Sequence, residues 1–500
     1  MTEHVSPPGL RSAGAVQGQQ VSFEYQPDDP KSLHWRSQTT SHEGHVDGAD
    51  VIGLIPLHNA QVNGFSATST DTHTHERREV GAYTLLTAQQ TKDPADTKVD
   101  GKSTPIFASL PIENPPEAFL REHLIAQPPA HLSVPRNSDG SPNLHIVIST
   151  LSGTGLALSI FADLVKPTLL SAGIAEDDYQ VHETQSAETV TDLTCSTFLP
   201  RANEGIRQTI ILLSGDGGVS DAINVLCSAT AGPNYVKPTI GLLTLGTGNA
   251  LGNSTGIAQG STLGLANLLK GSPTPLPLFL AQFSLGAERV VDEGRRSERF
   301  RSEIDGEGAM YGAVVCSWGF HAALVADSDT TEYRKFGAQR FQMAAKEELF
   351  PSNGEPPHRY KAKVSLINKA ADGTDHYEVL DRQEHMYVLT TMVSTLERGF
   401  TISPSSKPLD GQIRVVHFGP MSGDEAMRVM GLAYQGGLHI HDEVVSYEDV
   451  EGVRIDFDER EKDGRWRRVC IDGRIIRVEE GGYVEVRRLS RQVVDLVFAG

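Results

Sequence analysis

Cysteine is scarce in this sequence, with four residues among 500. Cys195, Cys227, Cys316 and Cys470 lie far apart and mostly within apolar runs. This pattern is typical of reduced thiols in a cytosolic protein and argues against a disulfide framework. Aromatic residues are also few, at 6% of the chain, but the apolar content is ordinary. A chain of this length is therefore expected to form two packed domains and some unpacked sequence.

Long apolar runs and a surplus of positive charge are missing as well. No run reaches the roughly 18 apolar residues that a membrane-spanning helix needs, and the nearest candidate, 310–326, is interrupted by glycine and His321. The start, MTEHVSPPGL, lacks the basic and apolar segments of a secretory signal. A formal net charge of −20 excludes a broad nucleic-acid surface. We expect a cytoplasmic protein that is soluble or peripherally associated with a membrane, without a nucleic-acid partner.

Four segments differ in composition. Residues 1–50 are rich in Pro, Gly, Ser, Gln and His and are predicted to be a disordered tail. Residues 51–140 contain short apolar runs between polar stretches, which indicates a weakly β-rich region with long loops. Strand-like runs alternate with helical periodicity over residues 141–272, as in an α/β domain with a parallel sheet. Short strand-like runs dominate residues 273–500, which predicts a second, largely antiparallel domain.

Three glycine turns follow strand-like runs of the predicted α/β domain. They are Ser152-Gly153-Thr154-Gly155, Gly215-Asp216-Gly217 and Gly246-Thr247-Gly248-Asn249. Glycine lets the backbone approach an anion closely, and a following helix points free N–H groups toward it. Any one of these turns could be a tight connection only. Three turns at successive strand ends would converge on one crevice, which favours a phosphate-bearing ligand.

Asp216 lies where a catalytic carboxylate would be expected, at the carboxyl end of a predicted parallel strand. In phosphoryl transfer such a carboxylate can accept the proton of the attacking hydroxyl, help to hold the water shell of Mg²⁺, or do both. The alternative is that Asp216 and Asp221 only cap a helix. The two flanking glycines favour a functional turn, because a plain cap would not need them.

The motifs SGDGGVSDAIN and LGTGNALGNS resemble the catalytic domain shared by diacylglycerol kinases, sphingosine kinases and bacterial lipid kinases of the same fold. Residues 317–341 and 410–439 look like the sphingosine kinase branch. The resemblance covers about residue 144 to the end of the chain. It implies a parallel-sheet nucleotide domain like those of NAD kinases and diacylglycerol kinases, followed by an antiparallel, sandwich-like lipid-binding domain. ATP and Mg²⁺ would be the cofactors.

The resemblance also assigns site residues. Asp216 matches the catalytic aspartate, which also holds Mg²⁺, directly or through water. The nucleotide-binding positions are Ser152, Gly153, Gly155, Thr184, Ser214, Gly215, Gly217, Gly246, Thr247, Gly248, Asn249, Arg334, Arg340 and Asp472. Arg334 and Arg340 would reach ATP phosphates, for which guanidinium groups are suited. On an ideal helix they lie about 120° apart, so convergence needs long side chains or a bend. The alternative for both is surface ion pairing.

Asp327 lies seven residues before Arg334, at the spacing of the aspartate that holds the amino-alcohol head group in sphingosine kinases. A carboxylate is the natural partner of a protonated amine, and diacylglycerol has none. The alternative is one acid among several in a solvated turn. Several positions depart from the family. Ser149-Thr150 stands in place of an Asn-Pro pair, and Thr244 replaces the usual proline before the third turn. Val315 replaces a substrate-binding serine, and Arg474 replaces the glutamate of an Asp-Gly-Glu motif.

These features predict a kinase that transfers the γ-phosphate of ATP to the primary hydroxyl of a sphingoid long-chain base. A kinase for diacylglycerol or another lipid alcohol is the first alternative. A non-catalytic lipid-sensing protein that retains the fold is the second, and the departures at Ser149 and Arg474 are its support. The sequence leaves the oligomeric state open.

Overall fold

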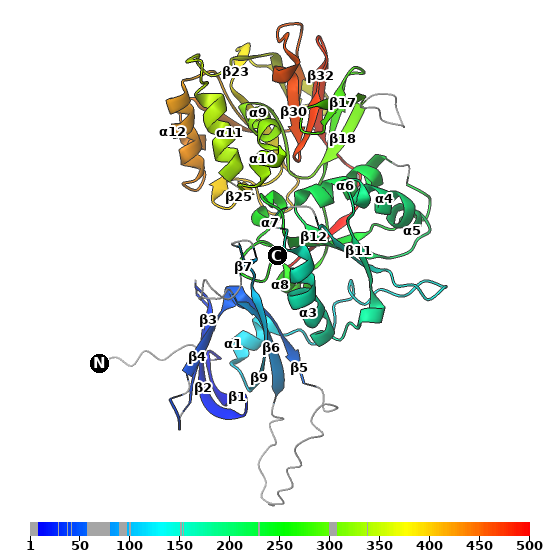
Figure 1. Cartoon of the computed structure of the whole chain (residues 1–500), viewed down its shortest axis with the longest axis vertical. Helices are drawn as coiled ribbons and strands as arrows, with labels where there is room; N and C mark the ends of the chain where they lie inside the picture. The colour runs from blue at the N-terminus through cyan, green and yellow to red at the C-terminus, as the bar shows by residue number, and fades with distance from the viewer. Residues whose placement is uncertain are drawn as a thin grey trace, which may run out of the picture.

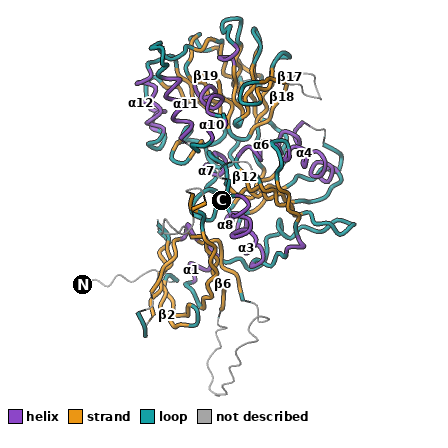
Figure 2. Tube along the Cα trace, in the orientation of Figure 1, coloured by secondary structure: helices purple, strands orange, loops and turns teal. Residues whose placement is uncertain are grey.

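The structure is a computed structural model that describes residues 9–500 except 29, 38, 42, 58–80, 90–97, 100–101, 151–152, 154, 229–230, 300–307 and 338. Three regions follow one another along the longest axis of the molecule (Figure 1). Strands build most of the first and last regions, whereas helices flank the strands of the middle one (Figure 2). No helix among the described residues is long and apolar enough to cross a membrane.

The first region is a seven-stranded antiparallel sheet in the order β4-β3-β2-β1-β9-β6-β5. Its strands are β1 (Arg11–Val16), β2 (Gln19–Gln26), β3 (Ser32–Ser37), β4 (Glu43–Asp47), β5 (Val51–Pro56), β6 (Ala82–Gln89) and β9 (Ile106–Glu113), with the hairpin β7 (Lys98–Val99) and β8 (Lys102–Ser103) beside them in the sequence. In β2, Val21, Phe23 and Tyr25 alternate with exposed residues and pack against helix α1 (Glu117–His123).

This sheet shows that two predictions about the N-terminal part of the chain, a disordered tail and a boundary at residue 50, were wrong. The predicted disordered tail over residues 1–50 forms four strands from Arg11 onward. The expected division at residue 50 also falls inside one sheet, because β4 and β5 both belong to it. A strand with one solvent face needs only every second residue to be apolar, so its average composition resembles that of an unpacked segment.

The central region is an α/β domain whose sheet has the order β11-β10-β12-β13-β33-β14. Its strands are β10 (Leu144–Ile148), β11 (Gln180–Glu183), β12 (Thr209–Ser214), β13 (Thr239–Thr244), β14 (Ser272–Pro275) and β33 (Asp495–Phe498). All neighbours are parallel except β14 and β33. Its helices are α2 (Ala157–Ile160), α3 (Lys166–Ser171), α4 (Thr189–Leu193), α5 (Leu199–Asn203), α6 (Asp216–Ser228), α7 (Ala250–Ser254) and α8 (Leu265–Lys270). The central strands β10, β12 and β13 are buried throughout, as a sheet covered on both faces requires.

The strand order has a topological switch point between β10 and β12. The chain passes from β10 to β11 on one side and continues with β12 on the other. Open α/β sheets bind ligands outside the carboxyl ends of the strands at such a point. The turns after β10 and β12 are the first two glycine turns, so the fold brings them to the expected crevice.

The structure corrects the predicted bounds of the C-terminal domain. The domain predicted over residues 273–500 does not contain all of them, because β33 inserts between β13 and β14 of the central sheet. Leu496 and Val497 are completely buried there. The nucleotide domain therefore contains residues from both ends of the predicted lipid domain.

The rest of the C-terminal region has two antiparallel sheets packed face to face through one apolar core. The first sheet contains β18 (Gly308–Gly312), β15 (Phe279–Phe283), β32 (Tyr483–Arg488), β29 (Gly452–Asp456), β21 (Lys363–Lys369) and β22 (Asp375–Val379). The second contains β17 (Arg296–Arg299), β16 (Glu288–Val291), β31 (Arg474–Arg477), β30 (Arg468–Ile471), β19 (Val315–Gly319), β24 (Tyr387–Thr391), β27 (Ile413–Phe418) and β28 (Val445–Val450). Two small hairpins pair β20 (Tyr360–Lys361) with β23 (Glu384–His385) and β25 (Thr395–Glu397) with β26 (Phe400–Thr401).

Helices cover the other face of the second sheet, so this region has three layers. They are α9 (Phe320–Ser328), α10 (Thr331–Arg334), α11 (Gln339–Leu349) and α12 (Gly423–Ala433). Leu389 of β24 and Val416 of β27 share an apolar cluster with Phe320 of α9 and Val429 of α12. The region is therefore the expected antiparallel β-rich domain, with a helical layer added.

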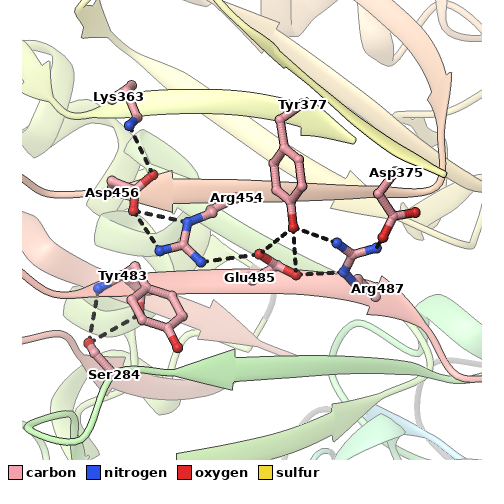
Figure 3. Close-up of polar contacts among 9 residues, drawn as sticks. All are labelled: Ser284, Lys363, Asp375, Tyr377, Arg454, Asp456, Tyr483, Glu485 and Arg487. Carbon is pink, nitrogen blue, oxygen red and sulfur yellow. Dashed lines mark hydrogen bonds and ion pairs between the residues drawn. The ribbon is translucent and has the colours of Figure 1, made fainter. Parts of the chain in front are cut away.

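The polar face of the first sheet carries a ladder of paired charges (Figure 3). It joins Lys363, Asp456, Arg454, Glu485, Arg487 and Asp375, which come from strands β21, β29, β32 and β22. The Arg454 guanidinium also lies 3.9 Å above the ring of Tyr483. Because the charges on this face are matched with one another, we interpret it as a solvated structural surface and not as the candidate site.

Candidate functional site

The three glycine turns meet at the switch point of the central sheet. A Cβ atom on Gly153 would lie 1.9 Å from the carbonyl oxygen of Leu245, and Gly153 has φ of +60°. A Cβ atom on Gly215 would lie 2.7 Å from Cα of Gly246. Such close approach of backbones leaves no room for a side chain, which explains the glycines. The convergence predicted from the sequence is thus present in the structure.

Asp216 begins α6 and faces the start of α7. Its Oδ2 accepts a hydrogen bond from Ala250 N at 2.6 Å, and its Oδ1 accepts one from Leu251 N at 3.1 Å. Burial raises the pKa of Asp216 above its ordinary value, and the two backbone N–H groups oppose that rise. Asp216 therefore caps a neighbouring helix, so part of the capping alternative holds, and each carboxylate oxygen has one described hydrogen-bond donor.

Asp472 brings a second carboxylate to this place from the C-terminal domain. It occupies the turn between β30 and β31 with φ of +46° and accepts hydrogen bonds from the backbone N–H groups of Ala313, Val314 and Val315 at 2.7, 3.1 and 2.8 Å. Burial, assisted by the negative charge of Asp216, raises the pKa of Asp472 to about 7. Two carboxylates from different domains thus lie close enough to affect each other's ionisation.

Arg474, the departure from the Asp-Gly-Glu motif, points at α6. Its guanidinium forms an ion pair with Asp221. Asn224, further along the same helix, exchanges two hydrogen bonds with the backbone of Tyr311, each at 2.9 Å. The helix that begins with Asp216 is therefore attached to the C-terminal domain by an ion pair and by two hydrogen bonds.

The third turn is held in shape by Asn249. Its Oδ1 accepts from Gly246 N at 2.9 Å, its Nδ2 donates to Gly246 O at 2.8 Å, and its φ is +52°. Asn253 Nδ2 donates to Gly248 O at 2.8 Å. By contrast, the Thr247 hydroxyl has no hydrogen-bond partner among the described residues. The structure thus gives Asn249 a loop-building role and leaves Thr247 free for a ligand, while nucleotide contact by either residue stays a prediction.

Thr184 and Ser214 lie at the ends of β11 and β12. Thr184 Oγ1 accepts from Thr150 N at 3.0 Å, and Thr150 Oγ1 donates to Thr184 O at 2.6 Å. Both Thr184 and Ser214 are buried, which suits a role in holding the turns. Gly155 and Gly217 are exposed, and a Cβ atom on either would meet nothing within 4 Å. Ser152 and Thr154 of the first turn lie outside the described residues.

Arg334 and Arg340 converge, although not on the glycine turns. Arg334 Nε and Nη2 each donate to the Asp329 carboxylate at 2.9 Å, and Arg340 Nη1 donates to the same carboxylate at 3.1 Å. Gly337, with φ of +56°, makes the bend that their spacing requires. Arg340 Nε is buried without a hydrogen-bond partner in the described part of the chain. Ion pairing, the alternative left open by the sequence, is therefore present, and the phosphate role stays a prediction.

Asp327 is fully engaged by two arginines. Arg465 Nη2 lies 2.9 Å from its Oδ2, and Arg468 Nη1 lies 2.7 Å from its Oδ1. Burial alone would raise the pKa of Asp327, but the hydrogen bond and charge of Arg468 lower it below the ordinary value. Burial and the hydrogen bond to Asp327 raise the pKa of Glu348, which pairs with Arg465, to about 7. This cluster already balances the charge of Asp327 before any amine is present.

A magnesium ion would have to be held mainly by Asp216 and Asp472. Among the residues that the structure describes, no three His, Cys, Asp or Glu side chains come together as a metal cluster. Nucleotide-bound Mg²⁺ usually takes one or two carboxylates together with phosphate oxygens and several waters. Asp216 and Asp472 would supply two carboxylates for it, and the negative charge of Asp216 acts on Asp472.

Sequence reasoning missed three partners of the predicted residues. Asp329, which holds both Arg334 and Arg340, stands two residues after Asp327 in ADSD, so spacing alone cannot tell which acid faces the arginines. Arg465 and Arg468 lie more than a hundred residues from Asp327, and only the fold brings them to it. The cluster RWRR near the end of the chain was the available signal.

Three glycine turns meet at the switch point of a parallel sheet, with a carboxylate in the middle turn, which is where open α/β sheets bind ligands. A comparison with protein families identifies this α/β domain more closely: residues 143–280 match the diacylglycerol kinase catalytic domain. This part of the chain thus carries the catalytic domain of a lipid kinase, which implies ATP as the phosphate donor.

Solved structures give a weaker likeness. One is described as "a putative diacylglycerol kinase from Bacillus anthracis str. Sterne", with 16% identity and a TM-score of 0.46 over 71% of this chain and 97% of that one. Another, of a diacylglycerol kinase from the same organism, has 14% identity and a TM-score of 0.43 over 71% and 96% of the two chains. Comparison with curated protein sequences gives no match. The domain assignment therefore depends on the family match.

Proposed function

We propose that this chain is an ATP-dependent kinase that phosphorylates the primary hydroxyl of a sphingoid long-chain base. The observation that carries the kinase reaction is the position of Asp216, at the meeting point of three glycine turns and close to Asp472. Phosphoryl transfer depends mainly on positioning and on charge stabilisation, and this arrangement offers backbone N–H groups for phosphate and a carboxylate for the attacking hydroxyl.

Each part of the site has a role in this proposal. The turns around Gly153, Gly215 and Gly246 hold the phosphates close to the backbone, and the free Thr247 hydroxyl is available to the nucleotide. Asp216 accepts the proton of the lipid hydroxyl, for which its raised pKa is favourable. Mg²⁺, when bound with the nucleotide, would offset phosphate charge next to Asp216 and Asp472.

The acceptor is the finer part of the proposal. Asp327 has the spacing expected of a residue that binds the sphingoid amine, and Glu348 adds a second carboxylate beside it. Diacylglycerol is a second candidate, favoured by one observation: Arg465 and Arg468 already neutralise Asp327, so a neutral head group would leave the cluster undisturbed. A lipid substrate also implies peripheral membrane contact. The scattered cysteines support a cytoplasmic location.

A substrate panel tests the proposal. Purified protein is incubated with labelled ATP and with sphingosine, phytosphingosine or diacylglycerol in the same mixed micelles. We expect labelling of the sphingoid bases, and stronger labelling of diacylglycerol would overturn the sphingoid assignment. Failure to bind Mg-ATP in calorimetry would instead favour a non-catalytic lipid-sensing protein.

Asp327→Asn tests the amine contact, with Asp372→Asn as a matched control in an exposed loop. Loss of activity on sphingosine with retained activity on diacylglycerol is the expected result. Because the substitution also leaves two arginines without their carboxylate, the melting temperature must be measured for both variants. Equal loss on both lipids would indicate a structural role only.

A further inference from the structure

Two arginines of the second sheet share one face at its end next to α6. In the antiparallel ladder, Arg289 of β16 lies opposite Ile476 of β31. Arg474 is two residues before Ile476 on the same strand, and side chains two apart point to the same face. Arg289 and Arg474 are thus diagonal neighbours, and both are half-buried.

Their closest negative partner is a single carboxylate. Arg474 forms its ion pair with Asp221 of α6, which is half-buried between the two domains. Arg289 makes no hydrogen bond or ion pair with any described residue. Glu188 and Glu298 also lie in this neighbourhood, but both are exposed, and Glu298 pairs with Arg296 at 2.9 Å. Solvent screens the charges of those two acids. The two guanidinium groups therefore carry more positive charge than the single half-buried carboxylate of Asp221 can balance.

The pair lies beside the candidate catalytic carboxylates. Arg474 follows Asp472 by two residues, and the negative charge of Asp216 raises the pKa of Asp472. Asp221 is on the same helix as Asp216, about 7.5 Å further along its axis. The turn between β30 and β31 therefore delivers both Asp472 and Arg474 to the first half of α6.

We propose that Arg289 and Arg474 form a phosphate-binding site at the domain interface, in which a phosphate group takes the place of Asp221 on Arg474. The ligand class is a phosphoryl group, carried by ATP or by the phosphorylated lipid product, and the proposal rests on the proposed kinase function. Guanidinium groups suit this task because they bind phosphate oxygens in a bidentate manner and stay charged at every relevant pH. A positive charge at the position where the family carries a glutamate is also explained in this way.

A purely structural ion pair makes a different prediction. If Arg474 and Asp221 only hold the domains together, removal of either residue weakens ligand binding in the same direction. If Asp221 instead competes with phosphate for Arg474, its removal strengthens phosphate binding. Changes in phosphate affinity of opposite sign on removal of Arg474 and of Asp221 would therefore distinguish a phosphate site from a purely structural ion pair.

Calorimetry on the full chain provides the test, with Mg-ATP and a phosphorylated sphingoid base as separate probes. Arg474→Gln and Arg289→Gln are each expected to weaken one probe at least about tenfold, as expected for loss of a charge-assisted hydrogen bond. Asp221→Asn is expected to strengthen the same probe about threefold, through release of Arg474. The probe that responds identifies the source of the phosphate. Arg289→Gln removes no ion pair of the described chain, so it remains informative if Arg474→Gln folds poorly.

Arg477→Gln is the matched control, because Arg477 belongs to the same strand but pairs with Glu288 on the opposite face. The affinity of the Arg477→Gln variant for both probes should match that of the wild type. Unchanged affinity for both probes in Arg289→Gln and Arg474→Gln would overturn the site, as would weakened binding in Asp221→Asn. Wild-type protein that fails to bind Mg-ATP but binds the lipid phosphate would refute the proposed kinase function while leaving this site to be judged on the lipid probe.

Discussion

Replacement of Asp472 by asparagine tests the two-carboxylate site through its pH dependence. The pKa of Asp472 is raised from 3.8 to about 7, chiefly by burial, with a contribution from Asp216. The folded protein therefore keeps the proton up to about pH 7, whereas the unfolded chain releases it near pH 4. A rise in pH from about 4.5 to 8 favours the unfolded chain, and the wild type loses roughly 3 kcal/mol of stability from this group.

Asparagine has the same shape but no carboxyl group to titrate. It offers one acceptor oxygen in place of two, so at least one of the three backbone N–H groups at Ala313, Val314 and Val315 loses its partner. That loss costs about 1–3 kcal/mol at every pH. The variant should be less stable than the wild type at pH 4.5 and should equal or exceed it at pH 8.

Thermal unfolding of both proteins at the two pH values is the assay. A relative change of roughly 3 kcal/mol corresponds to about 6–12 °C in melting temperature for a domain of this size. Asp372→Asn, in an exposed loop, serves as the control and should show no such change. A difference between wild type and Asp472→Asn that stays constant from pH 4.5 to 8 would refute the reasoning, because it would mean that the carboxyl group is ionised in the folded protein throughout.

Three further predictions concern the nucleotide domain. Asp216→Asn should lower kinase activity at least about a hundredfold in the labelled-ATP assay. Asparagine keeps only one acceptor oxygen for the N–H groups of Ala250 and Leu251, so the variant should also lose about 1–3 kcal/mol of stability. Gly246→Ala places a Cβ atom 2.4 Å from Cα of Gly215 and should abolish Mg-ATP binding in calorimetry, whereas Gly217→Ala meets nothing within 4 Å and should fold normally. Ser254→Ala removes two hydrogen bonds to the backbone of Thr395 and should cost about 1–3 kcal/mol in thermal unfolding. Wild-type behaviour of Asp216→Asn, Gly246→Ala or Ser254→Ala would contradict the corresponding contact.

The central fold was predictable because its signals are local. TIILLS and TIGLLT are continuous apolar runs that end at glycine turns, and fully buried parallel strands require such runs. The first sheet was not predictable in this way. Its centre depends on pairs such as Ala15 with Glu113, which are distant in the sequence, and its outer face has the polarity of an unpacked segment.

The residues of the candidate site also differ in whether local sequence could reveal them. Asp216 between two glycines could be found from the sequence because turn, strand and helix are adjacent there. The partners of Arg334, Asp327 and Arg474 could not, since an ion pair depends on which side chains the fold brings face to face. Spacing identified the charged residues of the lipid domain, but their counter-charges come from elsewhere in the chain.

The insertion of β33 between β13 and β14 has a consequence for biosynthesis. Asp495 and Leu496 pair with Thr239 and Ile240, so the central sheet has a gap until the end of this sequence has left the ribosome. The nucleotide domain, although encoded mostly in the middle of the chain, would complete its sheet only after β32 of the C-terminal region has been synthesised. During synthesis the edge of β13 that later pairs with β33 would be unpaired and open to chaperones. A fusion tag placed directly after Gly500 would be attached two residues beyond a core strand.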